Sequence, residues 1–440
     1  MISYRKIWKI SFPIFLSLLA QNIIIVVDTA FLGRVGEIEL GASAIGGLFY
    51  VCLFIVGFGF ANGTQILIGR RNGEGKFKEI GRYFDHSLYF LLTIGVLIIV
   101  FSKLYSDQIL KNILTSENIY LYSRKFLDIR IWGLLFAFVN MAFRAFFIGT
   151  TKTRYLTYSA SIMAVVNIIL DYAFIFGHWG FPVMGIEGAA LASVLAEFAS
   201  VLFFVFLAIF KIDRKKYNMF HFPKIDFILI RRILDVAFFM MMQFLVSIVA
   251  WFAFFMIIEK TGERPLAISN IIRSLYMIFT IPIFSLGAAT NTLVSNTIGE
   301  NKTEAVLPVI FRMSLISLLS ILGVIIVAFI FSTQILSFYT NDQSLINATM
   351  NTFYVTLGVL VVFSIAIIVL NGVAGTANTQ ISLIIELLAV GMYLITAYYL
   401  AIVLELPTHI VWCSEYLYFF ILGLLSVLYL RTGKWRNKTI

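Results

Sequence analysis

The sequence predicts an all-α integral membrane protein with twelve transmembrane helices in two pseudo-symmetric six-helix bundles. Its composition points to a membrane, because 60% of the 440 residues are hydrophobic and only 13% are charged, about half the charged fraction of a soluble protein. Apolar runs long enough to cross a bilayer recur along the whole chain. Residues 226 positions apart match through both halves, which divides these runs into two sets of six.

Each apolar run has at least the roughly 20 residues that a helix needs to cross a bilayer. The first run follows the basic segment MISYRKIWK without a small-residue cleavage site, which indicates a retained first helix rather than a signal peptide. We expect the twelve spans at residues 8–32, 42–69, 83–104, 126–148, 155–177, 186–210, 229–258, 265–298, 305–331, 349–373, 379–404 and 409–430.

The formal net charge of +10 is explained by where Lys and Arg stand between these spans. Most of the 33 basic residues fall in loops that share one side of the membrane with both termini. Cytoplasmic loops carry such an excess, so we expect both termini in the cytoplasm and the protein in the plasma (inner) membrane. This pattern accounts for the basicity without a nucleic-acid partner.

The longest basic stretch lies midway along the chain, at residues 211–232, and separates six expected spans from six. A link between two halves is the simplest role for such a stretch. We therefore expect an N-terminal lobe of residues 1–210, a cytoplasmic linker of residues 211–228, and a C-terminal lobe of residues 229–440.

The two halves share identical residues at a constant spacing of 226 positions. The matches gather at loop signals, and the register continues without a gap. Because each half holds an even number of helices, both copies have the same orientation and are related by an axis along the membrane normal. The matching pairs include Gly36 and Gly262, Glu37 and Glu263, Tyr50 and Tyr276, Thr64 and Thr290, Gly73 and Gly299, and Gly149 and Gly375.

The first span carries one carboxylate, Asp28, in its apolar run. A charge near the middle of a spanning helix costs about 3 kcal/mol on insertion scales, so such acids usually have a function. Ser17 and Gln21 share the helix face of Asp28, and we expect this face to look toward protein or water. Pro13 can kink the helix and act as a hinge. Asp28 is therefore a candidate ion or proton site; the alternative is an acid that is paired only for structure.

The fifth span contains a second acid, Asp171, four residues after Asn167 and therefore on the same helix face. Small residues continue this face, which suits close helix packing. An interhelical hydrogen bond alone would explain Asn167. The cost of burying a charge favours a function for Asp171, and we expect it to share one water-accessible pocket with Asp28.

Two further pairs follow the same four-residue spacing. On the fourth span, Asn140 precedes Arg144, whose charge needs an acidic partner at that depth. The alternative for Arg144 is that its side chain extends to the inner surface. On the sixth span, Ser193 precedes Glu197, which is either a third acid of the cavity or a structural acid that faces a neighbouring helix.

The second half keeps the scaffold but loses the acids of the first. Phe254 stands at the position of Asp28, and Asp171 has no acidic counterpart either. We therefore expect the ion chemistry in the N-terminal half. Arg273 and Glu386 are the charges that we place at depth in the second half; the sequence leaves open whether they line a substrate path or serve packing.

The sequence carries no enzyme signature. The segment GEGK at 73–76 is too short for a Walker loop, and neither a GxSxG motif nor paired acids for magnesium are present. Cys52 and Cys413 lie in apolar runs and suggest packing. Four histidines stand near helix ends without the spacing of metal ligands: His86, His178, His221 and His409. We expect no enzyme activity, no metal site and no cofactor.

Several motifs of this chain resemble the multidrug and toxic compound extrusion (MATE) family, and within it the DinF-like branch. These are VDTAFLG around Asp28, GTQILIGRRNGEGK with its weaker copy ATNTLVSNTIGENK, RAFFIGTTKTR, and NIILDY followed by GIEGAALASV. The resemblance covers nearly the whole chain. It implies two six-helix lobes with a cleft between them, alternating access, and export of amphipathic compounds in exchange for protons or sodium.

The resemblance also assigns residues. In this sequence the family's first-span acid, fifth-span pair, sixth-span hydroxyl and first-span proline correspond to Asp28, Asn167 with Asp171, Ser193, and Pro13. Two departures matter. Tyr172 follows the fifth-span acid where many members have proline, and Arg144 stands where some members have asparagine. A fixed cation beside the acids would repel sodium, so the sequence favours a proton.

We therefore expect a secondary active exporter of amphipathic, toxic small molecules, driven by a cation gradient with the proton favoured and working by alternating access. Its expected partners are these substrates and the lipid bilayer, and a monomer is expected. An alternative is a flippase of lipid-linked precursors from the same superfamily, although such proteins usually have two more helices. An integral-membrane enzyme is the alternative from another class, but no motif supports it.

Overall fold

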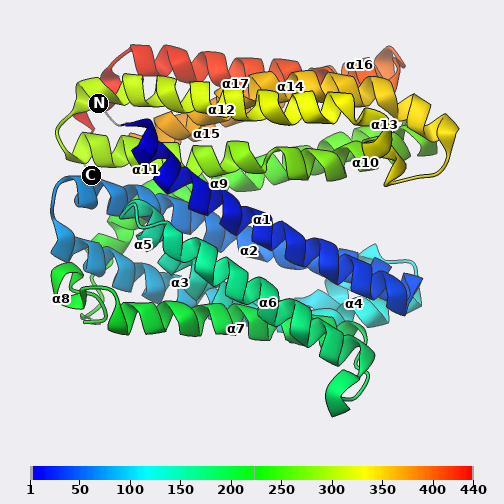
Figure 1. Ribbon diagram of the computed structural model, residues 1–440, viewed down its shortest axis with the longest axis horizontal. Helices are drawn as coiled ribbons and strands as arrows, with labels where there is room; N and C mark the ends of the chain where they lie inside the picture. Colours follow the sequence, from blue (N-terminus) through cyan, green and yellow to red (C-terminus); the bar gives the residue numbers. More distant parts are fainter. Residues whose placement is uncertain (1–2, 222, 439–440) are drawn as a thin grey trace. The chain divides into compact units, whose positions relative to one another are not determined.

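The computed structural model of the protein (Figure 1) describes residues 3–221 and 223–438, and these residues form helices and loops without a strand. Residues 1, 2, 222, 439 and 440, which the expected lobes and linker include, lie outside the described residues. The first half contains α1 (Tyr4–Val35), α2 (Glu37–Gly73), α3 (Phe77–Ile113), α4 (Glu117–Arg130), α5 (Gly133–Gly149), α6 (Arg154–Phe176), η1 (His178–Gly180), α7 (Ile186–Phe210) and α8 (Arg214–Tyr217).

The second half follows with a similar series of long helices. It contains α9 (Phe227–Glu259), α10 (Glu263–Phe279), α11 (Ile281–Gly299), η2 (Thr303–Ala305), α12 (Val306–Ile330), α13 (Ser332–Ser337), α14 (Gln343–Gly375), α15 (Thr379–Tyr398), η3 (Tyr399–Val403), α16 (Thr408–Trp412), α17 (Ser414–Arg431) and η4 (Lys434–Asn437).

In the described part of the chain, ten helices are long and apolar enough to cross a membrane. Two further pairs qualify when taken together: α4 with α5, bent by 50°, and α10 with α11, bent by 46°. Counting each bent pair as one span gives twelve, six in each half. The predicted fold class, an all-α membrane protein of two six-helix bundles, is confirmed.

The bend between α10 and α11 has a local cause. Pro282 lies in the first turn of α11 and has no N–H to donate to the carbonyl group of Ile278, so the helical hydrogen-bond ladder is interrupted. The equivalent position in the first half, 226 residues earlier, is Val56, and α2 continues through it without a break.

By its packing the chain divides into two compact units. We call Phe12–Met241 the first unit, and Met242 onward together with the residues up to Ser11 the second unit. Both divisions fall inside the first helix of a repeat, within α1 and within α9, and not in the basic linker. The start of α9 packs closely on α2, because a Cβ at Gly63 would lie only 2.3 Å from Ala237 Cα.

Within the first unit, α5 packs against α2, α3 and α7, and α7 also packs against α6 (Figure 1). Within the second unit, α14 packs against α11, α12 and α17, while α15 packs against α17. In both units one helix is therefore surrounded by several others.

Candidate functional site: a buried acid pair in the first unit

The structure brings together three of the predicted site residues: Asp28 on α1, and Asn167 and Asp171 on α6. Hydrogen bonding orients the amide nitrogen of Asn167 toward both acids, so that Nδ2 donates to Asp28 Oδ1 at 2.9 Å and to Asp171 Oδ2 at 3.3 Å. The carboxyl groups of Asp28 and Asp171 also lie within hydrogen-bond reach of each other.

The two acids differ in their exposure. Asp171 and Asn167 are fully buried, whereas Asp28 is partly exposed. Asp171 Oδ1 is buried and accepts no hydrogen bond from the described residues. The pair therefore combines an inner carboxyl group that has a free acceptor with an outer carboxyl group that is partly exposed.

The other predicted residues of the first span lie along the same helix. Ser17 is buried, and Gln21 is partly exposed. α1 continues through Pro13, whose carbonyl oxygen accepts a hydrogen bond from Thr157 Oγ1 of α6 at 2.9 Å. The division between the two units falls just before Pro13, which is the location that a hinge would require.

Glu197 of α7 pairs with a cation that we did not expect. Arg130, the last residue of α4, donates to Glu197 through both terminal nitrogens, at 2.9 and 2.6 Å, and both side chains are almost buried. Tyr50 Oη donates to Glu197 Oε1 at 3.3 Å, and its ring lies 3.7 Å from the guanidinium carbon. Gly133 makes room for the pair, since a Cβ there would lie 2.3 Å from Arg130 Nη1.

Arg144 of α5 does not have the acidic partner that the sequence suggested. Within residues 3–221 and 223–438 it forms no ion pair, and its guanidinium lies 5.7 Å from the ring centroid of Phe58. Arg130 is instead the cation that interacts electrostatically with Asp28. The physical reason is the bend between α4 and α5, which brings the end of α4 to α7.

Asn140 and Ser193, the remaining predicted residues, differ in their contacts. Asn140 Nδ2 donates to the backbone oxygen of Glu197 at 3.0 Å, and its Oδ1 accepts from Ser200 Oγ at 2.9 Å. Ser200 Oγ lies 2.5 Å from Ser159 Oγ of α6. Asn140 thus connects α5 to α7. Ser193 is partly exposed and forms no hydrogen bond to either aspartate in the described part of the chain.

The second unit holds buried acids of its own. Glu386 Oε1 of α15 accepts from Ser247 Oγ at 2.7 Å and from Tyr418 Oη at 2.6 Å. Glu415 of α17, which sequence reasoning missed, is buried beside Tyr276, and its Oε2 accepts no hydrogen bond from the described residues. Buried acidity is therefore not confined to the first unit.

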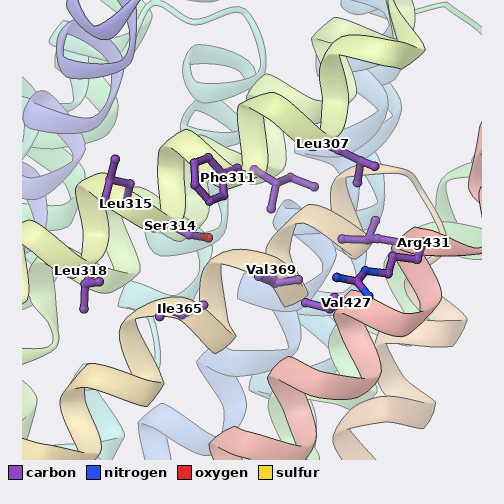
Figure 2. A pocket seen from close by; sticks show the side chains of 11 residues that line it. Leu307, Phe311, Ser314, Leu315, Leu318, Ile365, Val369, Val427 and Arg431 are labelled. Atoms are coloured by element: carbon purple, nitrogen blue, oxygen red, sulfur yellow. The ribbon is translucent and has the colours of Figure 1, made fainter.

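A cavity of about 440 Å³ lies in the second unit, away from these acids (Figure 2). Its walls are almost entirely apolar, and Ser314 and Arg431 are its polar residues. The lining residues come from α12, α14 and α17: Leu307, Ile310, Phe311, Ser314, Leu315, Leu318, Ile365, Val369, Val427, Leu430 and Arg431. Without a carboxylate, this cavity is separate in chemistry from the acid pair.

Sequence reasoning placed Arg130 near the start of the fourth span and assigned it no partner. The expected span began at residue 126, whereas the structure begins it at Glu117 and bends it after Arg130. The available signal was Gly133, a residue without a side chain beside a basic residue at the edge of an apolar run. Arg273, the arginine that the sequence placed at depth in the second half, is exposed and lies 5.3 Å from the Phe255 ring.

The fold and the site define a class of protein: a multi-pass membrane protein of two six-helix repeats with paired acids buried inside one of them, as in transporters. The chain belongs to the MatE family, whose sequence profile matches residues 13–173 and 239–400. The two matched segments begin 226 residues apart, at the spacing of the repeat. This confirms the MATE resemblance and identifies a transporter, not an enzyme. The DinF-like branch stays a prediction.

Two curated relatives cover most of the chain. The probable multidrug resistance protein YoeA of Bacillus subtilis is 26% identical over 368 residues, which are 81% of this chain and 78% of that protein. The probable multidrug resistance protein NorM of Thermotoga maritima is 24% identical over 442 residues, which are 99% of this chain and 94% of that protein.

A solved structure supports the fold. It is described as the outward-facing conformation of a multidrug resistance MATE family transporter of the MOP superfamily. The TM-score is 0.91 at 19% sequence identity, with 99% of this chain and 96% of that chain covered. At this level of identity the likeness concerns the fold alone.

Proposed function

We propose that this protein is an antiporter that exports amphipathic small molecules in exchange for protons, with Asp28 and Asp171 as the proton-carrying groups. The observation that supports this most is the bridge of Asn167 between the two acids. The names of the relatives, multidrug resistance proteins, support the substrate class. We further propose that both termini lie in the cytoplasm and that the chain works as a monomer in the inner membrane.

The proposed mechanism follows from the contacts of the pair. Two carboxylates within hydrogen-bond reach repel when both are ionised, so the pair retains one proton and titrates as a coupled unit. Loss of that proton weakens the contact between α1 and α6. Because α1 also extends into the second unit, a change in its position biases the exchange between inward-open and outward-open states.

The membrane potential supplies enough energy for such a bias. One charge that moves through about 100 mV contributes about 2.3 kcal/mol before any pH gradient is counted. A shift of that size changes the ratio of two states about fiftyfold, which suffices to redirect transport.

Sodium is the alternative coupling ion. The sequence argument against it assumed that Arg144 stands beside the acids, and Arg144 lies beside Phe58 instead. The preference for a proton therefore rests on the closeness of the two carboxyl groups, both of which Asn167 contacts, since two ionised acids at this separation repel each other. Export of a lipid-linked precursor remains the alternative within the superfamily.

The test is efflux of two fluorescent amphipathic dyes, one cationic and one anionic, from proteoliposomes at fixed membrane potential. We expect transport under a pH gradient without sodium, and no transport under a sodium gradient at equal pH on both sides. Transport that follows sodium and ignores pH would overturn the proton assignment. Transport under neither gradient would overturn the antiporter itself.

A further inference from the structure

An aromatic row runs along one face of α2. Tyr50, Phe54 and Phe58 are spaced four residues apart and therefore share a helix face. The ring centroids of Tyr50 and Phe54 lie 6.2 Å apart, and those of Phe54 and Phe58 lie 6.4 Å apart. At 1.5 Å of rise per residue, the row is about 12 Å long. Phe54 and Phe58 are partly exposed, so their rings have contact area available.

An arginine stands at each end of this row, and the two arginines differ in one respect. Arg130 lies over Tyr50 and is neutralised by Glu197. Arg144 lies over Phe58 and has no carboxylate partner within residues 3–221 and 223–438. A charged side chain inside a membrane almost always pairs or faces water, so the unpaired charge of Arg144 calls for an anion.

The depth of Arg144 rules out a simple extension to the inner surface. Gly149, at the end of α5, lies against Ile68 of α2, since a Cβ there would be 2.7 Å from Ile68 Cγ2. Measured along the helices from that level toward the membrane centre, the Cα of Arg144 is about 7.5 Å away, and the Cα of Phe58 is about 15 Å away. The side chain therefore points toward the membrane centre, as helical side chains lean toward the helix N-terminus.

We propose that Arg144 and the partly exposed end of the aromatic row, Phe54 and Phe58, bind the substrate, and that this substrate is an anionic amphiphile with a flat apolar body. The guanidinium receives a carboxylate, sulfate or phosphate group through paired N–H donors, and the rings stack on the body. This inference rests on the proposed export function and names its substrate class. Phe54, Phe58 and Arg144 are partly exposed, which lets a ligand reach them.

The test uses two ligands that differ only in the anion. Binding of tritiated estrone sulfate and of tritiated estrone to the purified full-length protein in detergent is measured by scintillation proximity. For Arg144→Gln we expect about tenfold weaker binding of estrone sulfate, the usual effect of losing a charge-assisted hydrogen bond, and a change of less than twofold for estrone. Phe58→Leu should weaken both ligands.

Two controls separate this site from general charge effects. Arg144→Lys keeps the charge and should retain most of the estrone sulfate affinity. Arg273→Gln removes a guanidinium that also lies beside a phenylalanine, in the second unit, and should change neither affinity. Equal loss of both ligands in Arg144→Gln, or an equal effect of Arg273→Gln, would overturn the proposal. Thermal unfolding verifies that each variant is folded.

Repeating the measurement in nanodiscs identifies the source of the anion. If phosphatidylglycerol in the disc competes with estrone sulfate in the wild type and not in Arg144→Gln, the site accepts a lipid headgroup. If phosphatidylglycerol has no effect, the site selects soluble anions. Binding needs no ion gradient, so its result stands even if the efflux test of the antiporter fails. Unchanged binding of estrone sulfate in Arg144→Gln would overturn the proposed site but not the antiporter function.

Discussion

The two repeats use the same helix crossing in opposite ways. In the first unit, Asp28 meets Asn167. The residues 226 positions later, Phe254 and Tyr393, also meet, with ring centroids 5.4 Å apart and nearly parallel. The scaffold thus places the same two positions in contact in both repeats. One contact is a titratable pair, and the other is an aromatic stack, so the fold requires the contact but not its chemistry.

The acids of the second unit occupy other positions. Glu386 and Glu415 lie on α15 and α17, where the first unit has Ala160 and Ala189 at the equivalent positions. Hydroxyl groups of Ser247 and Tyr418 donate to Glu386, and neither acid forms an ion pair within residues 3–221 and 223–438. The first unit balances its acid Glu197 with Arg130, whereas the donors to Glu386 are neutral hydroxyl groups.

The largest expected effect comes from removing the titratable group at the shared crossing. Asp28→Asn keeps the size and the hydrogen bonding of the side chain but cannot release a proton. We expect gradient-driven efflux to fall to the level of protein-free liposomes, while the variant inserts and unfolds at nearly the wild-type temperature. Efflux equal to that of the wild type would show that Asp28 is structural.

Phe254→Leu is the matched change in the second repeat. Phe254 is fully buried, and its ring also packs against Trp412 at 5.3 Å. Loss of the ring leaves space in a packed core, and we expect a cost of about 1–3 kcal/mol in the free energy of unfolding. Efflux per folded molecule and its pH dependence should stay unchanged. A shifted pH dependence in this variant would contradict the functional difference between the repeats.

Part of this site follows from the sequence. The cost of an intramembrane charge singles out Asp28 and Asp171, and the four-residue spacing places Asn167 on the same face as Asp171. Hydropathy and the repeat likewise predict the helical fold and its two halves, because span length is fixed by the bilayer. These features depend on local periodicity, which one sequence displays directly.

The partner of Glu197 does not follow from the sequence, because it depends on a bend. Arg130 lies near the start of the expected fourth span, and no spacing in the sequence indicates that this span is broken into α4 and α5. By its position in the span, Arg144 was the expected partner of a buried acid, but its side chain extends along α5 to Phe58. Tertiary geometry, which no spacing in the chain reveals, decides which arginine meets which acid.

An intermediate effect is expected when Glu197, the first-unit acid that pairs with a cation, is compared with Glu415, the second-unit acid that is buried beside a neutral tyrosine. Glu197→Gln leaves Arg130 buried without a counter-charge, which costs about 3–5 kcal/mol of stability. Glu415→Gln leaves no charge behind, and we expect a cost of less than about 1 kcal/mol. Thermal unfolding in detergent compares the two changes.

The double variant Arg130→Gln with Glu197→Gln serves as the control for this comparison. Because it removes both charges, it should recover part of the stability that Glu197→Gln loses. Equal unfolding temperatures for Glu197→Gln and Glu415→Gln would mean that the ion pair stabilises the fold no more than hydroxyl donors do.

The smallest expected effect concerns the start of α9, where the chain enters the second repeat. Asp226 caps this helix, because its Oδ1 accepts from the N–H groups of Ile228 and Leu229 at 3.0 and 3.1 Å. Arg82 of α3 lies 3.1 Å from Asp226 Oδ2. In α1, the equivalent helix of the first repeat, a neutral hydroxyl group has this role, because Ser3 Oγ accepts from the N–H of Lys6 at 3.3 Å. A carboxylate cap at this position is thus specific to the second repeat.

These contacts predict a dependence on pH. The backbone N–H of Leu229, followed by that of Ile228 and by the charge of Arg82, lowers the pKa of Asp226 below its ordinary value of 3.8. A carboxyl group whose pKa is lower in the folded state contributes stability above its ordinary pKa and loses it as the pH falls through the lowered pKa. The contribution should therefore be complete above about pH 5 and decline below that ordinary value.

Thermal unfolding of the wild type and of Asp226→Asn at pH 6 and pH 3 measures this contribution. We expect only a slightly lower unfolding temperature for the variant at pH 6, because solvent screens the exposed ion pair. The difference should be smaller at pH 3, because this pH lies below the ordinary pKa of the carboxyl group. Asp213→Asn, in the same linker, caps only the four-residue α8 and controls for the loss of a charge. A difference that is as large at pH 3 as at pH 6 would show that Asp226 acts through its shape and not through its charge, and the two repeats would then begin with helices of equal electrostatic character.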